Sequence, residues 1–149
     1  MRNRVEVMHG VNLDQLGRRD PAVYGGQTLT ELEVRVKRFA TELGLEPTFS
    51  QTNHEGEFCE NLHEARETVH GLILNPGAWT HYSYAIRDAL EVCGLPAVEV
   101  HISEVDSRED WRRESVIRDL CVGRVQGKGI DGYREALAIL KAELSGSGS

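Results

Sequence analysis

The sequence is poor in cysteine, with only Cys59, Cys93 and Cys121 among its 149 residues. These three lie far apart, are odd in number and form no C-x-x-C pair. A disulfide framework or a zinc knuckle needs paired cysteines at short spacing, so neither is expected. The three thiols are predicted to pack in the core.

Long apolar runs are also missing. No stretch approaches the roughly 20 apolar residues that a membrane-spanning helix needs, and the first eight residues contain no apolar secretion segment. We therefore expect no membrane partner and a cytoplasmic location.

Positive charge is scarce, since 17 Lys and Arg residues stand against 24 Asp and Glu residues and the formal net charge is −7. Nucleic acids are bound by basic surfaces, which argues against them as partners. Of the cations, 14 are arginines and only three are lysines. Arginine is a permanently charged fork that grips carboxylates. Clusters such as Arg18 with Arg19, and Arg108 with Arg112 and Arg113, therefore suit a small anion, although paired surface charges are often only solvated.

Apolar periodicity, broken by turn residues, predicts strands that alternate with helices. Strands are expected at residues 4–9, 46–52, 71–75, 97–101 and 120–126. Helices are expected at residues 28–43, 57–69, 82–92 and 130–144, the first opened by a capping box of Thr28 and Glu31. This order is typical of an α/β fold, here a flavodoxin-like three-layer sandwich with a five-stranded parallel sheet. Residues 1–144 are predicted to form one domain, and the Gly/Ser-rich residues 145–149 a flexible tail.

Such sheets bind ligands at the carboxyl ends of their strands. The polar residues that follow the predicted strands are Asn12, then Asn53 and His54, then Asn75 to His81, and finally His101 to Ser103. The loop at residues 10–27 is also longer than most loops in compact domains, and such loops are usually functional or disordered. A site is therefore expected at this edge of the sheet.

Several other motifs lack the surroundings they need. Residues 127–132 read GKGIDG and match the dinucleotide pattern G-x-G-x-x-G, but only 17 residues follow Gly132. The pattern requires a further strand with an acidic residue about 20 positions on, so these glycines are interpreted as a tight turn. The six histidines have no metal-ligand spacing, and no G-x-S-x-G elbow surrounds a serine. No metal and no cofactor are expected.

A set of longer segments resembles the type II 3-dehydroquinate dehydratases. The segments are GVNLDQLGRRDPAVYG at 10–25, QTNHEG at 51–56, LNPGAWTH at 74–81, AIRDA at 85–89, VEVHIS at 98–103 with REDWR at 108–112, and GKGIDGY at 127–133. The resemblance runs from about residue 4 to residue 144 in the order and spacing of the family. Several collinear motifs are far more specific than any one of them.

The resemblance implies a lyase that removes water from 3-dehydroquinate to give 3-dehydroshikimate, a step of the shikimate pathway and of quinate degradation. This chemistry needs a base, an oxyanion stabiliser and an acid. By resemblance Tyr24 is the base, with Arg19 and Arg108 supplying the positive charge that a phenolate needs. His101 resembles the general acid, and Glu99 is placed to hold its tautomer and charge. Asn12 resembles the residue that holds a water against the enolate.

The remaining family positions concern binding and assembly. Asn75, His81, Ile102, Ser103 and Arg112 match substrate contacts. Asp88 matches a position that reaches a neighbouring subunit, so the resemblance implies trimers assembled into a dodecamer. A Schiff-base route to the same product needs a desolvated lysine, and Lys37, Lys128 and Lys141 do not fit that role.

The chain also departs from the family pattern. His9 and Val11 stand where the family usually has Asn and Pro, and Asp14 and Gln15 replace Asn and Leu. Residues 114–119, from Glu114 to Asp119, replace the usual His-Ser-Tyr and Ser-Pro elements. Two alternatives therefore stay open. One is a diverged paralogue that acts on a related cyclic hydroxy acid. The other is a non-catalytic protein that binds small anions, although the retained pair of Tyr24 and His101 argues against it.

Overall fold

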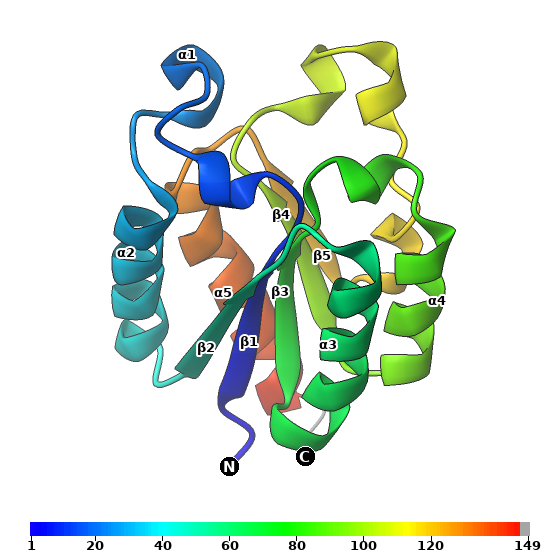
Figure 1. Cartoon of the computed structure of the whole chain (residues 1–149). Helices are drawn as coiled ribbons and strands as arrows, with labels where there is room; N and C mark the ends of the chain where they lie inside the picture. The colour runs from blue at the N-terminus through cyan, green and yellow to red at the C-terminus, as the bar shows by residue number, and fades with distance from the viewer. Residues whose placement is uncertain (147–149) are drawn as a thin grey trace.

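A five-stranded parallel sheet forms the centre of the computed structural model, which describes residues 1–146 (Figure 1). Its strands are β1 (Arg4–His9), β2 (Glu46–Gln51), β3 (Gly71–Asn75), β4 (Ala97–His101) and β5 (Gly123–Gln126), in the spatial order β2-β1-β3-β4-β5. The bounds of β1, β3 and β4 agree with the sequence-based expectation. The predicted α/β fold class is thereby confirmed.

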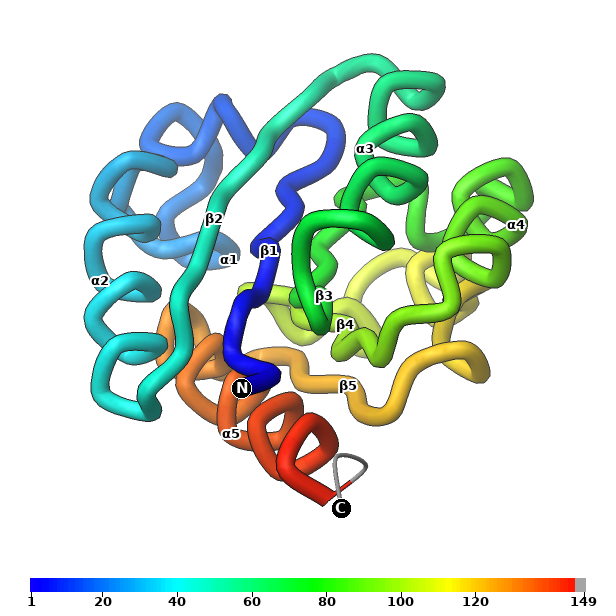
Figure 2. The backbone as a smooth tube through the Cα atoms, turned by 90° about the horizontal axis from the view of Figure 1, so that it is seen from below, coloured from blue at the N-terminus to red at the C-terminus, as the bar shows by residue number. Residues whose placement is uncertain are grey.

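Helices cover both faces of this sheet, as Figure 2 shows from below. The helices α2 (Leu29–Glu42) and α5 (Asp131–Gly146) lie on one face, and α3 (Glu55–Thr68) and α4 (Tyr84–Cys93) on the other. The predicted capping box opens α2, because the Thr28 hydroxyl accepts from the Glu31 N–H and the Glu31 carboxylate accepts from the Thr28 N–H. It satisfies two amides that the first turn of the helix leaves unpaired.

The two helical layers create two cores, because neighbouring residues of a strand point to opposite faces. Val5 and Val7 of β1 pack with α2 and α5, whereas Met8 packs with α3 and α4. In β4, Val98 and Val100 join the first core. Glu99 and His101 alternate with them and therefore point to the opposite face. This alternation places a carboxylate and an imidazole side by side on one strand.

The order of the strands positions the functional edge. The chain passes from β1 to β2 on one side, and β3 then pairs with β1 on its other side. Connections that follow β1 and β3 therefore diverge, and a crevice opens between them at the carboxyl end of the sheet. The loop that contains α1 (Pro21–Tyr24) and the segment that follows β4 both rise above this edge (Figure 1).

Some element boundaries differ from the predicted ones. Helix α3 begins at Glu55 instead of residue 57, and α4 begins at Tyr84 because the Ser83 side chain caps it. Strand β5 begins at Gly123 instead of residue 120, since Arg118–Leu120 form a 3₁₀ turn. Helix α5 continues through Gly146, so the predicted tail starts two residues too early. Leu144, which is buried, anchors this last turn against the core. The rest of that tail, residues 147–149, lies outside the described residues.

The described helices include none that is long and apolar enough to cross a membrane.

Gly10, the first residue after β1, offers a test of how closely the crevice is packed. A Cβ atom at this buried position would lie 2.2 Å from the carbonyl oxygen of Pro76. We expect Gly10→Ala to destabilise the fold by about 1–3 kcal/mol, the usual cost of overpacking. Urea unfolding measures this change in the free energy of unfolding.

Gly56→Ala is the matched control, because Gly56 is exposed in α3 and a Cβ there would meet nothing within 4 Å. It should stabilise the fold by about 0.4–1 kcal/mol, since alanine has fewer unfolded conformations. Equal effects of the two substitutions would contradict the packing described here.

Candidate active site

A pocket of about 560 Å³, counting its mouth, lies at the carboxyl end of the sheet. The lining comes from the loop after β1, the turn after β3 and the segment after β4: Val11, Asn12, Leu13, Arg19, Tyr24, Asn75, Gly77, Ala78, His81, His101, Ile102, Ser103, Val105, Arg108 and Arg112. Residues that are distant in the sequence therefore converge at the edge that strand topology selects.

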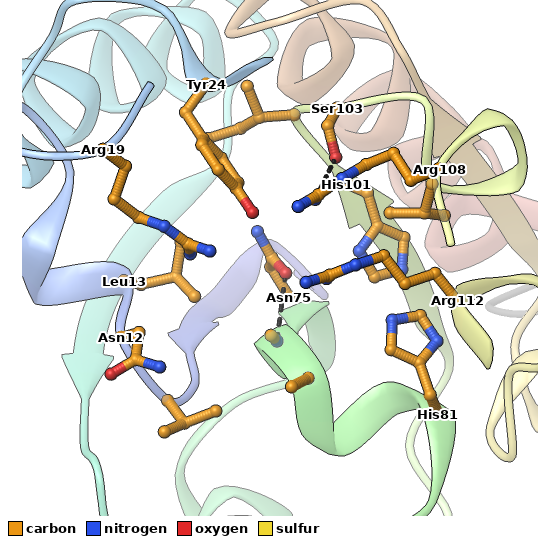
Figure 3. Close-up of a pocket in the computed structure, with 15 residues that line it drawn as sticks. Asn12, Leu13, Arg19, Tyr24, Asn75, His81, His101, Ser103, Arg108 and Arg112 are labelled. Atoms are coloured by element: carbon orange, nitrogen blue, oxygen red, sulfur yellow. Dashed lines mark hydrogen bonds between the residues drawn. The ribbon is translucent and has the colours of Figure 1, made fainter. Parts of the chain in front are cut away.

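Tyr24 lies between two arginines in this pocket. The guanidinium carbon of Arg19 is 3.9 Å from the centre of the Tyr24 ring, and that of Arg108 is 5.1 Å away. Figure 3 shows the Tyr24 hydroxyl pointing into the centre of the pocket, with Arg112 approaching from the side of His81. Three guanidinium groups around one hydroxyl make the pocket suited to anionic groups.

Two of these arginines are oriented by their neighbours on the segment after β4. Arg108 donates to the Ser103 hydroxyl at 3.2 Å, and Arg112 donates to the Glu109 carboxylate at 3.1 Å. The Ile102 and Ser103 carbonyls accept from the N–H groups of Gly129 and Gly127. The glycine turn that resembled a dinucleotide motif therefore supports the wall of this pocket.

His101, at the end of β4, forms a buried pair with Glu99. The distance from His101 Nε2 to Glu99 Oε2 is 2.6 Å, and both side chains are nearly inaccessible to solvent. Because Nε2 is engaged with the carboxylate, Nδ1 is the ring nitrogen available to the pocket. An imidazole that is held in this way can deliver a proton at a fixed position.

Glu99 stays ionised because three donors surround it. Ser115 donates to Oε1 at 2.8 Å, while His101 and the Arg124 Nε–H both contact Oε2, at 2.6 and 3.0 Å. Burial alone would raise the pKa of Glu99, but the hydrogen bonds and charge of these donors outweigh it and lower the pKa to about 2.

His81 forms a second imidazole wall of the pocket. The centres of the His81 and His101 rings lie 6.3 Å apart in a stacked arrangement. The His81 Nδ1 lies 2.7 Å from the Glu114 carbonyl oxygen. Burial lowers the pKa of His81, and the nearby His101 and Arg112 act in the same direction, against the Glu114 carbonyl. A neutral ring whose Nδ1–H donates to that carbonyl leaves Nε2 as an acceptor for a ligand hydroxyl.

The two asparagines of the site are each held by a hydrogen bond that involves a backbone N–H group. Asn12 has a left-handed backbone (φ 68°), and its N–H donates to the Asn53 side chain at 2.8 Å. Asparagine is among the few residues that adopt this conformation at low cost. The Asn75 Oδ1 accepts from the Gly77 N–H at 3.2 Å, which fixes the amide over the floor of the pocket (Figure 3).

The structure brings most of the sequence-predicted site residues together. Ten of them line the pocket: Asn12, Arg19, Tyr24, Asn75, His81, His101, Ile102, Ser103, Arg108 and Arg112. Glu99 lies behind His101, and Asp88 lies apart, exposed on α4. Within residues 1–146, no group of three or more His, Cys, Asp and Glu side chains could hold a metal ion, and metal independence stays a prediction.

Sequence reasoning missed Ser115 and Arg124, which both bind Glu99. A signal for Arg124 was present, because a charged residue within a predicted buried strand needs a partner. Ser115 carried no such signal, since a serine in a polar connection is ordinary.

This chain is similar to known proteins over most of its length. A family model described as "Dehydroquinase class II" matches residues 3–141. A 3-dehydroquinate dehydratase of Bacillus pumilus is 49% identical over 137 residues, which cover 92% of this chain and 93% of that protein. The chain belongs to the type II dehydroquinase family.

Further members are similarly close. A 3-dehydroquinate dehydratase of Bacillus subtilis is 45% identical, with 94% of this chain and 95% of that protein covered. The crystal structure of a type II dehydroquinase from Butyrivibrio crossotus matches with a TM-score of 0.89 and 38% identity, covering 93% of this chain and 97% of that one.

The positions at which this chain departs from the type II dehydroquinase pattern form ordered contacts. Buried His9 lies with Nε2 3.1 Å from the Glu33 carboxylate, without the alignment of a hydrogen bond. Asp14 accepts from the Asn53 side chain at 3.0 Å. Asp119 accepts from Arg87, whose Nη1 also donates to the Val116 carbonyl at 2.7 Å. The divergent segment at 114–119 is therefore fastened to α4 and to the site.

The low pKa of Glu99 predicts how stability depends on pH. The folded pKa of about 2 lies below the ordinary value of 4.5, so ionised Glu99 stabilises the fold fully above about pH 4.5. This contribution, about 3 kcal/mol, is lost as the pH falls from 4.5 toward 2. Glu99→Gln should remove it, and urea unfolding between pH 2 and 7 should show the gap to wild type closing with acid. Glu60→Gln, at an exposed position of α3, is the control. A constant gap for Glu99→Gln over this range would contradict the argument.

Proposed function

We propose that this chain is a 3-dehydroquinate dehydratase, a hydro-lyase that converts 3-dehydroquinate to 3-dehydroshikimate. The observation that carries the proposal is a tyrosine between two arginines and a carboxylate-held histidine that line one pocket. The names of the relatives at 45–49% identity support the same reaction. A protein that only bound small anions would not need this acid–base pair.

Tyr24 acts as the base in this proposal. It takes a proton from the carbon next to the substrate ketone, and the electron pair moves to the ketone oxygen as an enolate. The positive charges of Arg19 and Arg108 lie beside the ring of this base. Asn12, at the mouth of the same pocket, holds a water that donates to the enolate oxygen.

His101 acts as the acid in the second half of the reaction. The enolate collapses to re-form the ketone and the new C=C bond, and the C–O bond of the hydroxyl breaks. The His101 Nδ1–H supplies the proton, so the group leaves as water instead of hydroxide. Glu99 stabilises the charged imidazole before the transfer and keeps its ring in place afterwards. One proton is gained at Tyr24 and one is lost at His101, and exchange with solvent resets both.

The rest of the lining orients the substrate. Arg112 and the backbone at Ile102 and Ser103 bind the carboxylate, because they bring a cation and main-chain amides to one wall. Asn75 and neutral His81 bind ring hydroxyls, for which they offer amide and imidazole partners. These contacts fix the ring between the base and the acid.

The proposal is tested by mixing the purified chain with 3-dehydroquinate and following the ultraviolet absorbance of the conjugated product. Tyr24→Phe removes one oxygen and little volume, so folding should survive. Turnover should fall by about 10²–10⁴-fold, the usual value of a positioned base. Tyr82→Phe, at an exposed tyrosine outside the pocket, should keep the wild-type rate. Near-normal turnover by Tyr24→Phe would assign proton abstraction to another group.

Assembly is a further part of the proposal. Asp88 is exposed on α4 and does not line the pocket of its own chain. We propose that it serves the site of a neighbouring subunit in a trimer, and that trimers form a dodecamer. Light scattering should then give a mass well above the 16.7 kDa of one chain. Asp88→Ala should raise KM more than it lowers kcat, and a fully active monomer would overturn this assignment.

A further inference from the structure

Within the part of the chain that the structure describes, Arg124 is the one charged residue outside the pocket whose side chain binds the buried Glu99. Strands β4 and β5 pair with Glu99 opposite Arg124, so both side chains point to the same face of the sheet. Arg124 Nε donates to Glu99 Oε2 at 3.0 Å, and its side chain is only 13% exposed. The partnership is therefore built into the register of two neighbouring strands.

The same carboxylate oxygen also contacts His101 Nε2, at 2.6 Å. Both nitrogens lie close to one oxygen, so the guanidinium and the imidazole are less than about 6 Å apart. Two cations at that separation disfavour each other, while the shared carboxylate favours both. The charge of Arg124 therefore competes with a protonated His101 for Glu99.

Arg124 also reaches the segment that carries the pocket arginines. Its Nη1 lies 3.6 Å from Asp106, which belongs to the 3₁₀ turn Val105–Ser107 directly before Arg108. Gln126, the next residue on that face of β5, donates to the Asp106 carboxylate at 2.8 Å. This hydrogen bond, with Arg124 and Arg118 nearby, lowers the pKa of Asp106. Arg124 thus links the Glu99–His101 pair to the wall that holds Arg108.

We propose that Arg124 is a positioning residue: it fixes the Glu99 carboxylate beneath His101 and offsets part of its charge, so that His101 releases its proton more readily to the substrate. This inference rests on the proposed role of His101 as the general acid. Without Arg124, an uncompensated buried carboxylate would hold the imidazolium too tightly for rapid transfer.

Other charged and titratable groups also face the pair, and the variants must leave them unchanged. From the surrounding elements they are Tyr24, His81, Asp106, Arg108, Arg112, Asp119 and Cys121. None of their side chains binds the Glu99 carboxylate. Within residues 1–146, the three side chains that do belong to His101, Ser115 and Arg124. Among the described residues, Arg124 is therefore the cation whose removal changes the charge beside Glu99 and leaves the pocket lining intact.

Arg124→Gln tests the proposal, because it removes the charge and keeps an amide that can donate. The kcat should fall about tenfold with little change in KM. The basic limb of the kcat profile, on which the acid loses its proton, should move to higher pH by about one unit. Arg124→Lys restores the charge and should return the profile toward wild type. Arg134→Gln, at an exposed arginine that pairs with Glu42, is the matched control and should change neither quantity.

Two further readouts separate the possible failures. An NMR titration of the His101 ring, in wild type and in Arg124→Gln, measures how Arg124 affects the protonation of His101 and needs no turnover. If wild-type protein failed to dehydrate 3-dehydroquinate, the proposed function would fall while this titration still tested Arg124. If Arg124→Gln lowered only the melting temperature and left the titration and the pH profile unchanged, the role of Arg124 would be structural and the inference wrong.

Discussion

The buried negative charge of Glu99 is the constraint around which the site is organised. A carboxylate with no solvent exposure is costly unless hydrogen bonds and opposite charges replace its lost hydration. Here the replacements come from His101 on the same strand, Arg124 on the next strand, and Ser115 in the connection between them. Ser115 and Arg124 therefore have two functions. They stabilise the fold, and they also determine how strongly Glu99 holds the His101 ring. Losing one donor would affect both the stability and the chemistry of the site.

The opposite wall of the pocket is formed by a loop and not by a strand of the sheet. Tyr24 is half-buried on a one-turn helix in a long loop, and it is held between Arg19 of the same loop and Arg108 of the segment after β4. The sheet supplies rigid support for His101, the proposed acid, whereas a loop supplies Tyr24, the proposed base. Loops that carry a catalytic group on a rigid scaffold can close over a substrate and exclude water, which strengthens the charge interactions inside. The position of the proposed acid therefore depends on strand register, and that of the proposed base on cation–ring contacts.

The sequence predicted the fold well because its two main signals, apolar patterning and the capping box, both act over short stretches of chain. Apolar runs gave β1, β3 and β4 to the residue, and the Thr28–Glu31 spacing gave the start of α2. The start of β5 was misplaced, because Leu120, Cys121 and Val122 form an apolar run that resembles a strand, although Leu120 ends a 3₁₀ turn and the strand begins only at Gly123. The residues that line the pocket were predicted from their positions after the strands and from motifs that resemble those of the family. Arg124 was missed because its partner depends on which strands are neighbours, which periodicity does not reveal. Ser115 was missed because a serine in a polar connection carries no signal of its partner.

The divergent segment at residues 114–119 bears on whether the chemistry of the family is retained. Glu114 holds His81 through its backbone carbonyl, and Val116 holds Arg87 in the same way. A backbone carbonyl is available whatever the side chain, so substitutions at these two positions leave the contacts intact. The side chain of this segment that reaches the Glu99–His101 pair is Ser115, which binds Glu99 directly. The exposed side chains of the segment, Glu114, Arg118 and Asp119, can therefore differ from those of the family, while the groups that line the pocket keep their supports. That pattern favours a dehydratase that retains its substrate over a paralogue with a new one.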